Sequence, residues 1–163
     1  MKNNSHEKWM RIALEEAEKA LNEKELPIGG VLVSNGKLIA RSQTQVRRRQ
    51  SMAAHSELLI LLDSKGLLFT AQHPLVMYST LEPCIMCLGA MIQCGIDELV
   101  YGMRCAPDGG TSLAGYIANS GQKVPKITSG VLEKECVSLF RKWPHPPDHP
   151  AYKYVQAILD VYR

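Results

Sequence analysis

The sequence predicts a three-layer α/β/α domain built around a central mixed sheet. Segments whose apolar residues recur at helical spacing alternate along the chain with short apolar runs of strand length. Two of these runs flank Asn35-Gly36, a dipeptide typical of tight antiparallel hairpins because both residues tolerate positive φ. Strands that alternate with helices imply a sheet covered on both faces. We expect residues 1–163 to form one domain, with 144–163 as a C-terminal lid or an appended helix.

The composition supports a folded protein and excludes several classes. Hydrophobic residues make up 45% of the 163 residues and charged residues 21%, values typical of a single globular domain. The net charge of +3 permits an anionic partner without requiring one. No apolar run is long enough for a membrane span, and the polar N-terminus lacks the core of a signal peptide. We therefore expect a cytoplasmic protein with no membrane partner.

The N-terminal half begins with a helix over 5–25, where apolar residues such as Trp9 and Ala13 fall at helical spacing. The hairpin follows over 28–41. A second helix is expected over 52–65, with Gly66 at the position after its end. Glycine is common there because it adopts the left-handed backbone conformation without a steric penalty.

The C-terminal half alternates short strands with helices. The apolar runs predict strands over 75–80, 98–102 and 124–127. A helix is expected between the first two, with Pro83 at its first position and Gly95 after its end. The remaining expected elements are a glycine-rich loop through Gly115, a helix over 131–142 and a last helix over 151–162.

Two segments carry residues suited to chemistry, His55-Ser56-Glu57 and Pro83-Cys84-Ile85-Met86-Cys87, and both lie at predicted helix starts. His55 and Glu57 would point to opposite sides of a regular helix, so they can serve one site only beyond its end. Cys84 and Cys87 are three residues apart and share a helix face. Because helix N-termini favour anions, thiolates are stabilised there. A metal held between the two helix starts satisfies all these spacings.

One histidine and two cysteines are ligands suited to zinc. Structural zinc sites normally have four protein ligands, whereas catalytic sites leave one position open for water. No fourth ligand is evident near either segment. His55, Cys84 and Cys87 therefore predict a catalytic Zn²⁺ whose bound water ionises near neutral pH. The five cysteines are an odd number, which argues against a disulfide framework.

The pair of segments resembles the signature H-x-E…P-C-x-x-C of zinc deaminases, and the chain is identified as a member of the cytidine/deoxycytidylate deaminase-like superfamily. Three further stretches extend the resemblance. Residues 26–30 are similar to fungal-type cytosine deaminases, residues 80–90 to guanine deaminases and bacterial tRNA adenosine deaminases, and residues 127–136 to the tRNA enzymes. The resemblance implies the cytidine deaminase-like fold and a hydrolase acting on the C–N bonds of cyclic amidines.

The resemblance also implies roles for individual residues. His55, Cys84 and Cys87 would bind zinc, and Glu57 would move protons between water, the ring nitrogen and the leaving ammonia, which is ordinary general acid–base work. The remaining implied positions contact the substrate. Ile28 and Gly29 would line the base pocket, and the backbone around Ser56 and Glu82 would hydrogen-bond the base.

One departure bears on the substrate. The family usually carries asparagine eleven residues before the zinc histidine, where it contacts the base or ribose, and Thr44 stands there in this chain. A hydroxyl cannot offer the paired donor and acceptor of an amide. With the modest net charge, this favours a small substrate, a nucleobase or nucleoside, over tRNA. Arg41 and Arg47–Arg49, just before the zinc histidine, keep a tRNA adenosine-to-inosine deaminase as the alternative.

The motif itself also allows two non-deaminase interpretations. The segments could form a non-catalytic zinc-binding module, and the Cys-x-x-Cys pair alone could indicate thioredoxin-like redox chemistry. The redox interpretation gives no reason for His55 and Glu57. We expect a homodimer packed partly through the helix over 83–94, from the family resemblance and the apolar residues of that helix.

Overall fold

The computed structural model describes residues 3–64, 66–144 and 146–163. Its sheet has five strands in the order β2-β1-β3-β4-β5. The first strand is antiparallel to both of its neighbours, while the last three strands of the chain are parallel to one another, so the predicted mixed sheet is confirmed. The strand bounds are β1 Gly29–Ser34, β2 Lys37–Gln43, β3 Leu75–Leu81, β4 Glu98–Met103 and β5 Lys126–Thr128.

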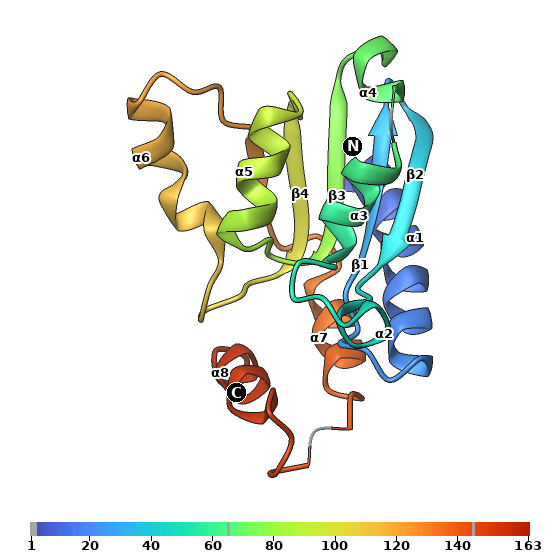
Figure 1. The fold of residues 1–163 in the computed structure, drawn as a ribbon, viewed down its shortest axis with the longest axis vertical. Coiled ribbons are helices and arrows are strands. Elements are labelled where there is room, and N and C mark those ends of the chain that lie inside the picture. Colours follow the sequence, from blue (N-terminus) through green and yellow to red (C-terminus); the bar gives the residue numbers. More distant parts are fainter. Residues whose placement is uncertain (1–2, 65, 145) are drawn as a thin grey trace.

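Helices cover both faces of the sheet, which gives the expected three layers (Figure 1). Their bounds are α1 Asn3–Asn22, α2 Val46–Arg49, α3 Ser56–Asp63, α4 Leu67–Thr70, α5 Ile85–Gln93, α6 Ala114–Asn119, α7 Glu133–Phe140 and α8 Tyr152–Asp160, with a 3₁₀ helix η1 over Gly110–Leu113. One face packs against α1 and α7, and the other against α3 and α5. No described helix is long and apolar enough to cross a membrane.

Strand β1 shows why the apolar runs are continuous rather than alternating. Val31 and Val33 belong to the core cluster under α1, whereas Leu32 belongs to the cluster under α3 and α5. Successive side chains of a strand point to opposite faces, so a strand covered on both sides must be apolar at every position. All three residues are at most 2% exposed.

The hairpin forms as predicted, with Asn35 at φ 44° and Gly36 at φ 74° between β1 and β2. The predicted helix over 5–25 is observed but ends at Asn22. Lys24 takes the left-handed conformation at φ 62°, and the Glu25 amide donates to the Ala20 carbonyl, which closes the helix as a C-terminal cap does.

The helix starts that flank the site lie later than predicted. The helix predicted over 52–65 begins at Ser56, because His55 is extended at its N-cap. Gly66 does not end it in a left-handed conformation; it lies in the helical region at the N-cap of α4. Pro83 lies outside α5, whose N-cap is Cys84, while Gly95 does follow the end with φ 71°.

The prediction of a glycine-rich loop through Gly115 is wrong over part of its length. The 3₁₀ helix η1 and helix α6 occupy 110–119. Nearby glycines and short apolar stretches obscured these short elements. The later elements are shorter than predicted or displaced: β5 is Lys126–Thr128, α7 begins at Glu133 after Leu132 at φ 52°, and α8 is Tyr152–Asp160.

Candidate active site

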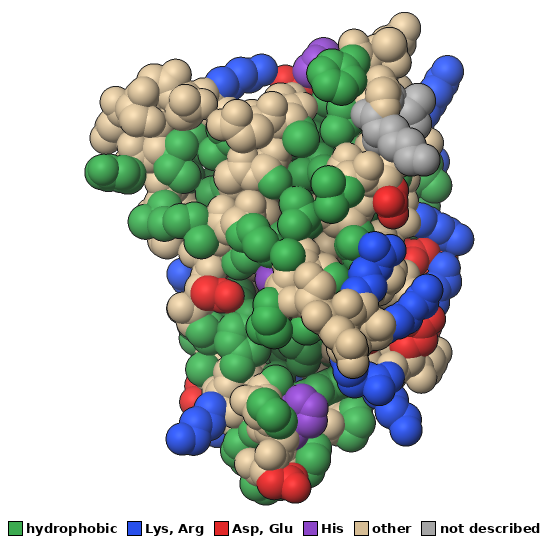
Figure 2. All heavy atoms as spheres, viewed as in Figure 1, with side chains coloured by type: hydrophobic (Ala, Val, Ile, Leu, Met, Phe, Trp, Pro, Cys, Tyr) green, Lys and Arg blue, Asp and Glu red, His purple; other side chains and the backbone are tan. Residues whose placement is uncertain are grey.

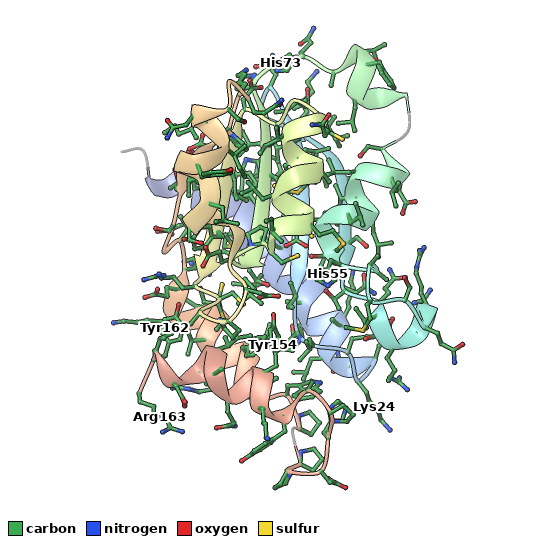
Figure 3. The ribbon with its side chains drawn as sticks, turned by 60° about the vertical axis from the view of Figure 1, so that its left-hand side comes forward. Lys24, His55, His73, Tyr154, Tyr162 and Arg163 are labelled. Carbon is green, nitrogen blue, oxygen red and sulfur yellow. The ribbon has the colours of Figure 1, made fainter. Side chains whose placement is uncertain are left out.

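The site is built at one end of the sheet, where α3 and α5 begin (Figure 3). His55 is the N-cap of α3 and keeps an extended backbone, with φ −76° and ψ 149°. Glu57 lies in the first turn of the same helix and is 3% exposed. An N-cap side chain leaves the helix end rather than its flank, so both residues can face one site despite their spacing.

The second helix start repeats this arrangement. Cys84 is the extended N-cap of α5, and Cys87 lies in its first turn, fully buried. The connection from β3 is held by the Gly110 amide, which donates to the Pro83 carbonyl at 2.8 Å. A Cβ on Gly110 would lie 2.8 Å from the Ile85 backbone nitrogen, so glycine is required where η1 packs against this helix start.

The three predicted ligands meet in space. His55 Nδ1 lies 3.6 Å from Cys84 Sγ and 3.6 Å from Cys87 Sγ. Zinc bonds of about 2.3 Å to sulfur and about 2.0 Å to nitrogen, at a tetrahedral angle, would place these atoms about 3.6 Å apart. Among the described residues, His55, Cys84 and Cys87 are the group of three with metal-ligating geometry. Both the donor chemistry and the spacing therefore fit zinc.

The electrostatics of the cluster favour a thiolate. The hydrogen bond with Cys87, opposed by burial and aided by His55, lowers the pKa of Cys84 to about 4. The same thiol pair raises the pKa of Cys87, with burial and the Glu57 carboxylate adding to the effect. The hydrogen bond to Cys84 raises the pKa of His55 against the effect of burial. The first proton therefore leaves Cys84, and a cation is needed to ionise both thiols together.

A pocket opens on this cluster, with a free volume of about 20 Å³, enough for about one water molecule. Residues from six parts of the chain line it: Ile28, Thr44, His55, Glu57, Leu81, Glu82, Pro83, Cys84, Asp108 and Tyr154. Three of the five residues for which we expected substrate contacts are in this set, namely Ile28, Thr44 and Glu82. Gly29 and Ser56 are outside it.

Gly29 and Ser56 do not line the pocket, although each is next to a residue that does. A Cβ on Gly29 would lie 2.2 Å from the Ala13 carbonyl oxygen, so glycine allows α1 to pack directly on β1. The Gly29 amide donates to the Thr80 hydroxyl at 3.1 Å. Ser56 is fully buried, and its hydroxyl donates to the Glu57 carboxylate.

The buried side chain of Thr44 is unusual in its hydrogen bonding. It is 2% exposed, and its hydroxyl has no hydrogen-bond partner among the described residues, although its backbone amide donates to the Ile28 carbonyl. Buried hydroxyls are normally paired, because an unpaired one costs about 1–3 kcal/mol. The hydroxyl therefore remains available to a molecule that enters the pocket.

The Glu82 side chain holds a neighbouring loop in place. Its carboxylate accepts hydrogen bonds from the Cys105 amide, at 3.0 Å, and from the Thr111 hydroxyl. A Cβ on Gly109 would lie 2.5 Å from this carboxylate. Glu82 thus anchors the loop between β4 and η1, which carries Asp108 to the pocket.

Asp108 and Tyr154 line the pocket although no sequence pattern pointed to them. Tyr154 comes from α8, on the side of that helix toward His55 (Figure 3), and its hydroxyl donates to Asp108 Oδ1 at 3.1 Å. The Cys105 thiol donates to the same oxygen at 2.9 Å, and burial, with this contact, raises the pKa of Cys105 to about 12. Asp108 lies in a segment that resembled a plain glycine-rich connection, so only the tertiary fold reveals it.

A family model described as the cytidine and deoxycytidylate deaminase zinc-binding region matches residues 3–103, which include the three ligand positions. The tRNA-specific adenosine deaminase of Bacillus subtilis (strain 168) is 38% identical over 136 residues, covering 80% of this chain and 83% of that protein. The tRNA-specific adenosine deaminase of Agrobacterium fabrum (strain C58) is 34% identical over 139 residues, covering 83% and 91%.

Solved structures show the same architecture. One, from work on A-to-I editing by tRNA:A34 deaminases at the wobble position of transfer RNA, has a TM-score of 0.72 at 32% identity and covers 80% of this chain and 97% of that one. A guanine deaminase from Nitrosomonas europaea has a TM-score of 0.72 at 23% identity, covering 84% and 83%, which shows a shared fold.

Proposed function

The chain belongs to the zinc-binding cytidine and deoxycytidylate deaminase family, and from this premise we propose that it deaminates a small amino-heterocycle, a free nucleobase or a nucleoside. Water replaces the exocyclic amino group, leaving a carbonyl on the ring and releasing ammonia. The observation that carries the choice of a small substrate is the position of Tyr154, which α8 brings over the pocket beside His55.

His55, Cys84 and Cys87 would hold the zinc, which when bound lowers the pKa of water to about 7. Glu57 is the carboxylate placed to move protons, since it lines the pocket and its Oε2 lies 3.7 Å from Cys87 Sγ. It would accept a proton from the attacking water and pass it to the ring nitrogen beside the reacting carbon. A second proton transfer through the same carboxylate would let the amine leave as ammonia.

The polar groups of the pocket suit a flat heterocycle. Thr44 offers a hydroxyl that no other described residue engages, and Asp108 offers a carboxylate that can accept hydrogen bonds from ring or exocyclic N–H groups. Ile28 and Leu81 supply apolar lining. We propose that these residues, with Glu82 holding the loop of Asp108, form the substrate contacts.

The C-terminal segment supports a small substrate. Val155 and Ile158 of α8 are fully buried in the core cluster that also includes Phe140 of α7, so the helix is packed and not pendant. Tyr154 is thereby held over the pocket. We propose that 144–163 is a lid in which the packed helix stays in place while the Tyr154 side chain moves aside for a base and closes over it, excluding water and a polymer alike. The described part of this segment lacks only residue 145.

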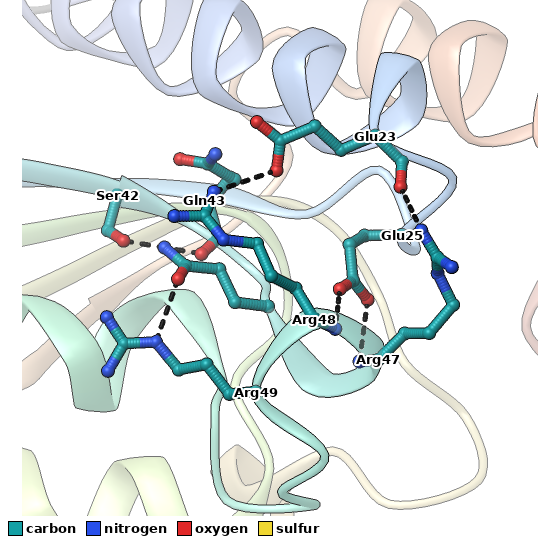
Figure 4. Close-up of polar contacts among 8 residues, drawn as sticks. Glu23, Glu25, Ser42, Gln43, Arg47, Arg48 and Arg49 are labelled. Carbon is teal, nitrogen blue, oxygen red and sulfur yellow. Dashed lines mark hydrogen bonds and ion pairs between the residues drawn. The ribbon is translucent and has the colours of Figure 1, made fainter.

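A tRNA adenosine deaminase is the second candidate, favoured by the similarity of the chain to two tRNA-specific adenosine deaminases. Its phosphate contacts would fall to the arginines before His55. Figure 2 shows Lys and Arg side chains gathered over α2 and the neighbouring part of the surface. In this structure the arginines of α2 are engaged within the chain (Figure 4).

Each α2 arginine contacts a group within the chain, and two of them share Glu23. Arg47 donates to the Glu23 carbonyl at 2.8 Å, Arg48 pairs with the Glu23 carboxylate at 3.3 Å, and Arg49 donates to the Gln45 amide oxygen at 2.8 Å. These exposed contacts are individually weak, and each uses one nitrogen of a guanidinium that has five N–H donors. The intrachain contacts therefore reduce, without removing, the donors that these arginines offer to phosphate, which supports the small substrate over the polymer.

Ammonia release from a panel of substrates tests the proposal. The zinc-loaded protein would be assayed with cytosine, guanine, adenine, their nucleosides and a tRNA anticodon stem-loop. We expect turnover of at least one free base or nucleoside, insensitive to salt between about 50 and 200 mM. Turnover of the stem-loop alone, falling steeply with salt, would establish the second candidate. A fully zinc-loaded protein that releases no ammonia from any of them would favour a non-catalytic zinc-binding module.

A further inference from the structure

Two buried serines contact the carboxylate to which the proposed function assigns proton transfer. Ser79 Oγ donates to Glu57 Oε1 at 2.6 Å, and Ser56 Oγ donates to Glu57 Oε2 at 3.0 Å. Both serines are 0% exposed, and Glu57 is the partner that each hydroxyl has among the described residues. Each carboxylate oxygen is therefore held by its own hydroxyl.

The two hydroxyls come from different layers of the fold. Ser79 lies in the central strand β3, paired with Gly30 of β1 on one side and Tyr101 of β4 on the other. Ser56 is the first residue of α3, next to Glu57 itself. Because one donor is fixed to the sheet and the other to the helix, the plane of the carboxylate is defined relative to both.

The packing around the serines keeps this arrangement in place. A Cβ on Gly30 would lie 3.0 Å from Ile60 Cδ1 and 3.6 Å from Ser56 Oγ, so the glycine leaves the space in which helix α3 approaches the sheet. A residue in a strand that is covered on both faces would ordinarily be apolar, as Met77 and Leu81, two positions before and after Ser79, are. A hydroxyl in such a position requires an acceptor, and Glu57 provides it.

We propose that Ser79 and Ser56 are positioning residues that hold the Glu57 carboxylate in the orientation needed for proton transfer. Glutamate has three rotatable side-chain bonds, and a displacement of about 1 Å at a reacting group can cost about 10²-fold in rate. Two fixed donors remove that freedom before the substrate arrives. This inference rests on the proposed function, because it assigns the serines a role only through Glu57.

The matched variants Ser79→Thr and Ser79→Val test the proposal, since threonine and valine have nearly the same shape and differ in the hydroxyl. Each zinc-loaded protein would be assayed with the substrate that the wild-type protein turns over. We expect kcat of Ser79→Val to be about tenfold below that of Ser79→Thr, which is about 1.4 kcal/mol in the barrier, with KM within about twofold. Zinc content and melting temperature should not fall below those of Ser79→Thr.

Crystal structures of the two variants give a readout that does not depend on turnover. The Glu57 carboxylate should keep its place in Ser79→Thr and be displaced or split between conformers in Ser79→Val. Ser56→Ala tests the second hydroxyl in the same way, and it serves alone if Ser79→Val does not fold. Equal kcat values and an unmoved carboxylate in the variants that lack the hydroxyl would overturn the proposal.

Failure of the proposed function would give a different result. A wild-type protein that releases no ammonia, while its Glu57 carboxylate still shifts in Ser79→Val, would refute the activity and leave the positioning role in place. Full wild-type turnover with identical kinetics in Ser79→Thr and Ser79→Val would refute the positioning role and leave the activity in place.

Discussion

His55 shows how one residue at a helix end can face a site that the flank of the helix could not reach. Its extended N-cap backbone directs the ring toward Cys84 and Cys87, while Glu57 remains in the first turn. The spacing of the histidine and the glutamate, which is unsuitable for a regular helix, therefore becomes suitable at its start. The same holds for Cys84 at the start of α5.

Removing both cysteine ligands should remove the zinc. We expect the double variant Cys84→Ala, Cys87→Ala to lose the roughly one zinc per chain of the wild-type protein and to melt at lower temperature, since zinc binding energy is partly folding energy. Cys94→Ala is the control, because Cys94 is a half-buried cysteine outside the cluster. Metal analysis and thermal unfolding measure both effects, and full zinc occupancy in the double variant would contradict the ligand assignment.

Asp97 gives a prediction for acid stability. Burial would raise its pKa, but hydrogen bonds from His73, the Leu75 amide and Lys123 outweigh burial and lower it to about 2. A carboxyl group with a depressed folded-state pKa stabilises the fold above its unfolded value near 3.8, and this stabilisation is lost as the pH falls toward 2.

We therefore expect Asp97→Asn to lower the free energy of unfolding by about 1 kcal/mol at pH 6. This is less than the full pKa shift would give, because solvent screens the partly exposed groups. The variant should differ little from the wild-type protein near pH 2. Urea unfolding at both pH values measures the difference. Equal losses of unfolding free energy at the two values would mean that the ionised carboxylate is not responsible.

At the scale of elements, α8 is the part of the fold with the clearest consequence for function. It supplies Tyr154 to a pocket whose other residues come from the sheet, the loops at its end and the starts of α3 and α5. The packing of Val155 and Ile158 fixes the helix, while the Tyr154 hydroxyl connects it to Asp108. A lid of this kind would act on substrate binding more than on the chemical step.

Tyr154→Ala should therefore raise KM for the small substrate by about tenfold while changing kcat less. The contact between Tyr154 and the substrate would stabilise the bound substrate and the transition state equally, so its loss weakens binding without raising the barrier from the bound state. Zinc content should be unchanged, since Tyr154 is not a ligand. Lys153→Ala, an exposed change in the same helix, is the control. Steady-state kinetics of the three proteins measure the effect, and an unaltered KM would refute the role of Tyr154 as a lid.

The sequence predicted the elements that have strong periodicity or strong turn chemistry, but not their exact ends. The Asn35-Gly36 hairpin was predicted correctly because φ is positive at both residues. The start of α3 was predicted too early because the residues before His55 are compatible with a helix. In the structure the backbone at His55 is extended and the helix begins only at Ser56. The short helices α2 and α4 were missed because a single turn has too few residues to show a period.

The site was predictable where chemistry restricts the choice of residue. Few residues other than histidine and cysteine suit zinc, so the three ligand positions could be selected from type and spacing. Asp108, Tyr154 and Ser79 could not, because aspartate, tyrosine and serine are common and the contacts that matter are long-range. Thr44 was selected through the family resemblance, and the structure adds that its hydroxyl has no hydrogen-bond partner among the described residues.

At the scale of the whole molecule, the exposed apolar surface suggests how copies of the chain could associate. Figure 2 shows hydrophobic side chains gathered over the face formed by α3 and α5. Leu62 of α3 is 64% exposed, and Ile85 and Met86 of α5 are 55% and 38% exposed. A contiguous apolar surface of this kind commonly marks an interface.

We propose a homodimer packed partly through α5. Light scattering should give twice the chain mass, and Met86→Glu should shift the population toward monomer by placing a charge in the interface. Val161→Glu, at a 54% exposed position beyond the end of α8, is the matched control and should stay dimeric. A wild-type chain that remains monomeric at high concentration would exclude this assembly.

The most direct test of the central claim, that this chain is a zinc deaminase whose proton transfers pass through Glu57, compares the wild-type protein with Glu57→Gln at equal zinc content. Glutamine keeps the shape of the side chain but cannot accept and return a proton. We predict that Glu57→Gln binds about one zinc per chain and releases ammonia at least about 10²-fold more slowly, the effect expected for loss of a general acid–base. Near wild-type turnover by the zinc-loaded Glu57→Gln protein would contradict the account.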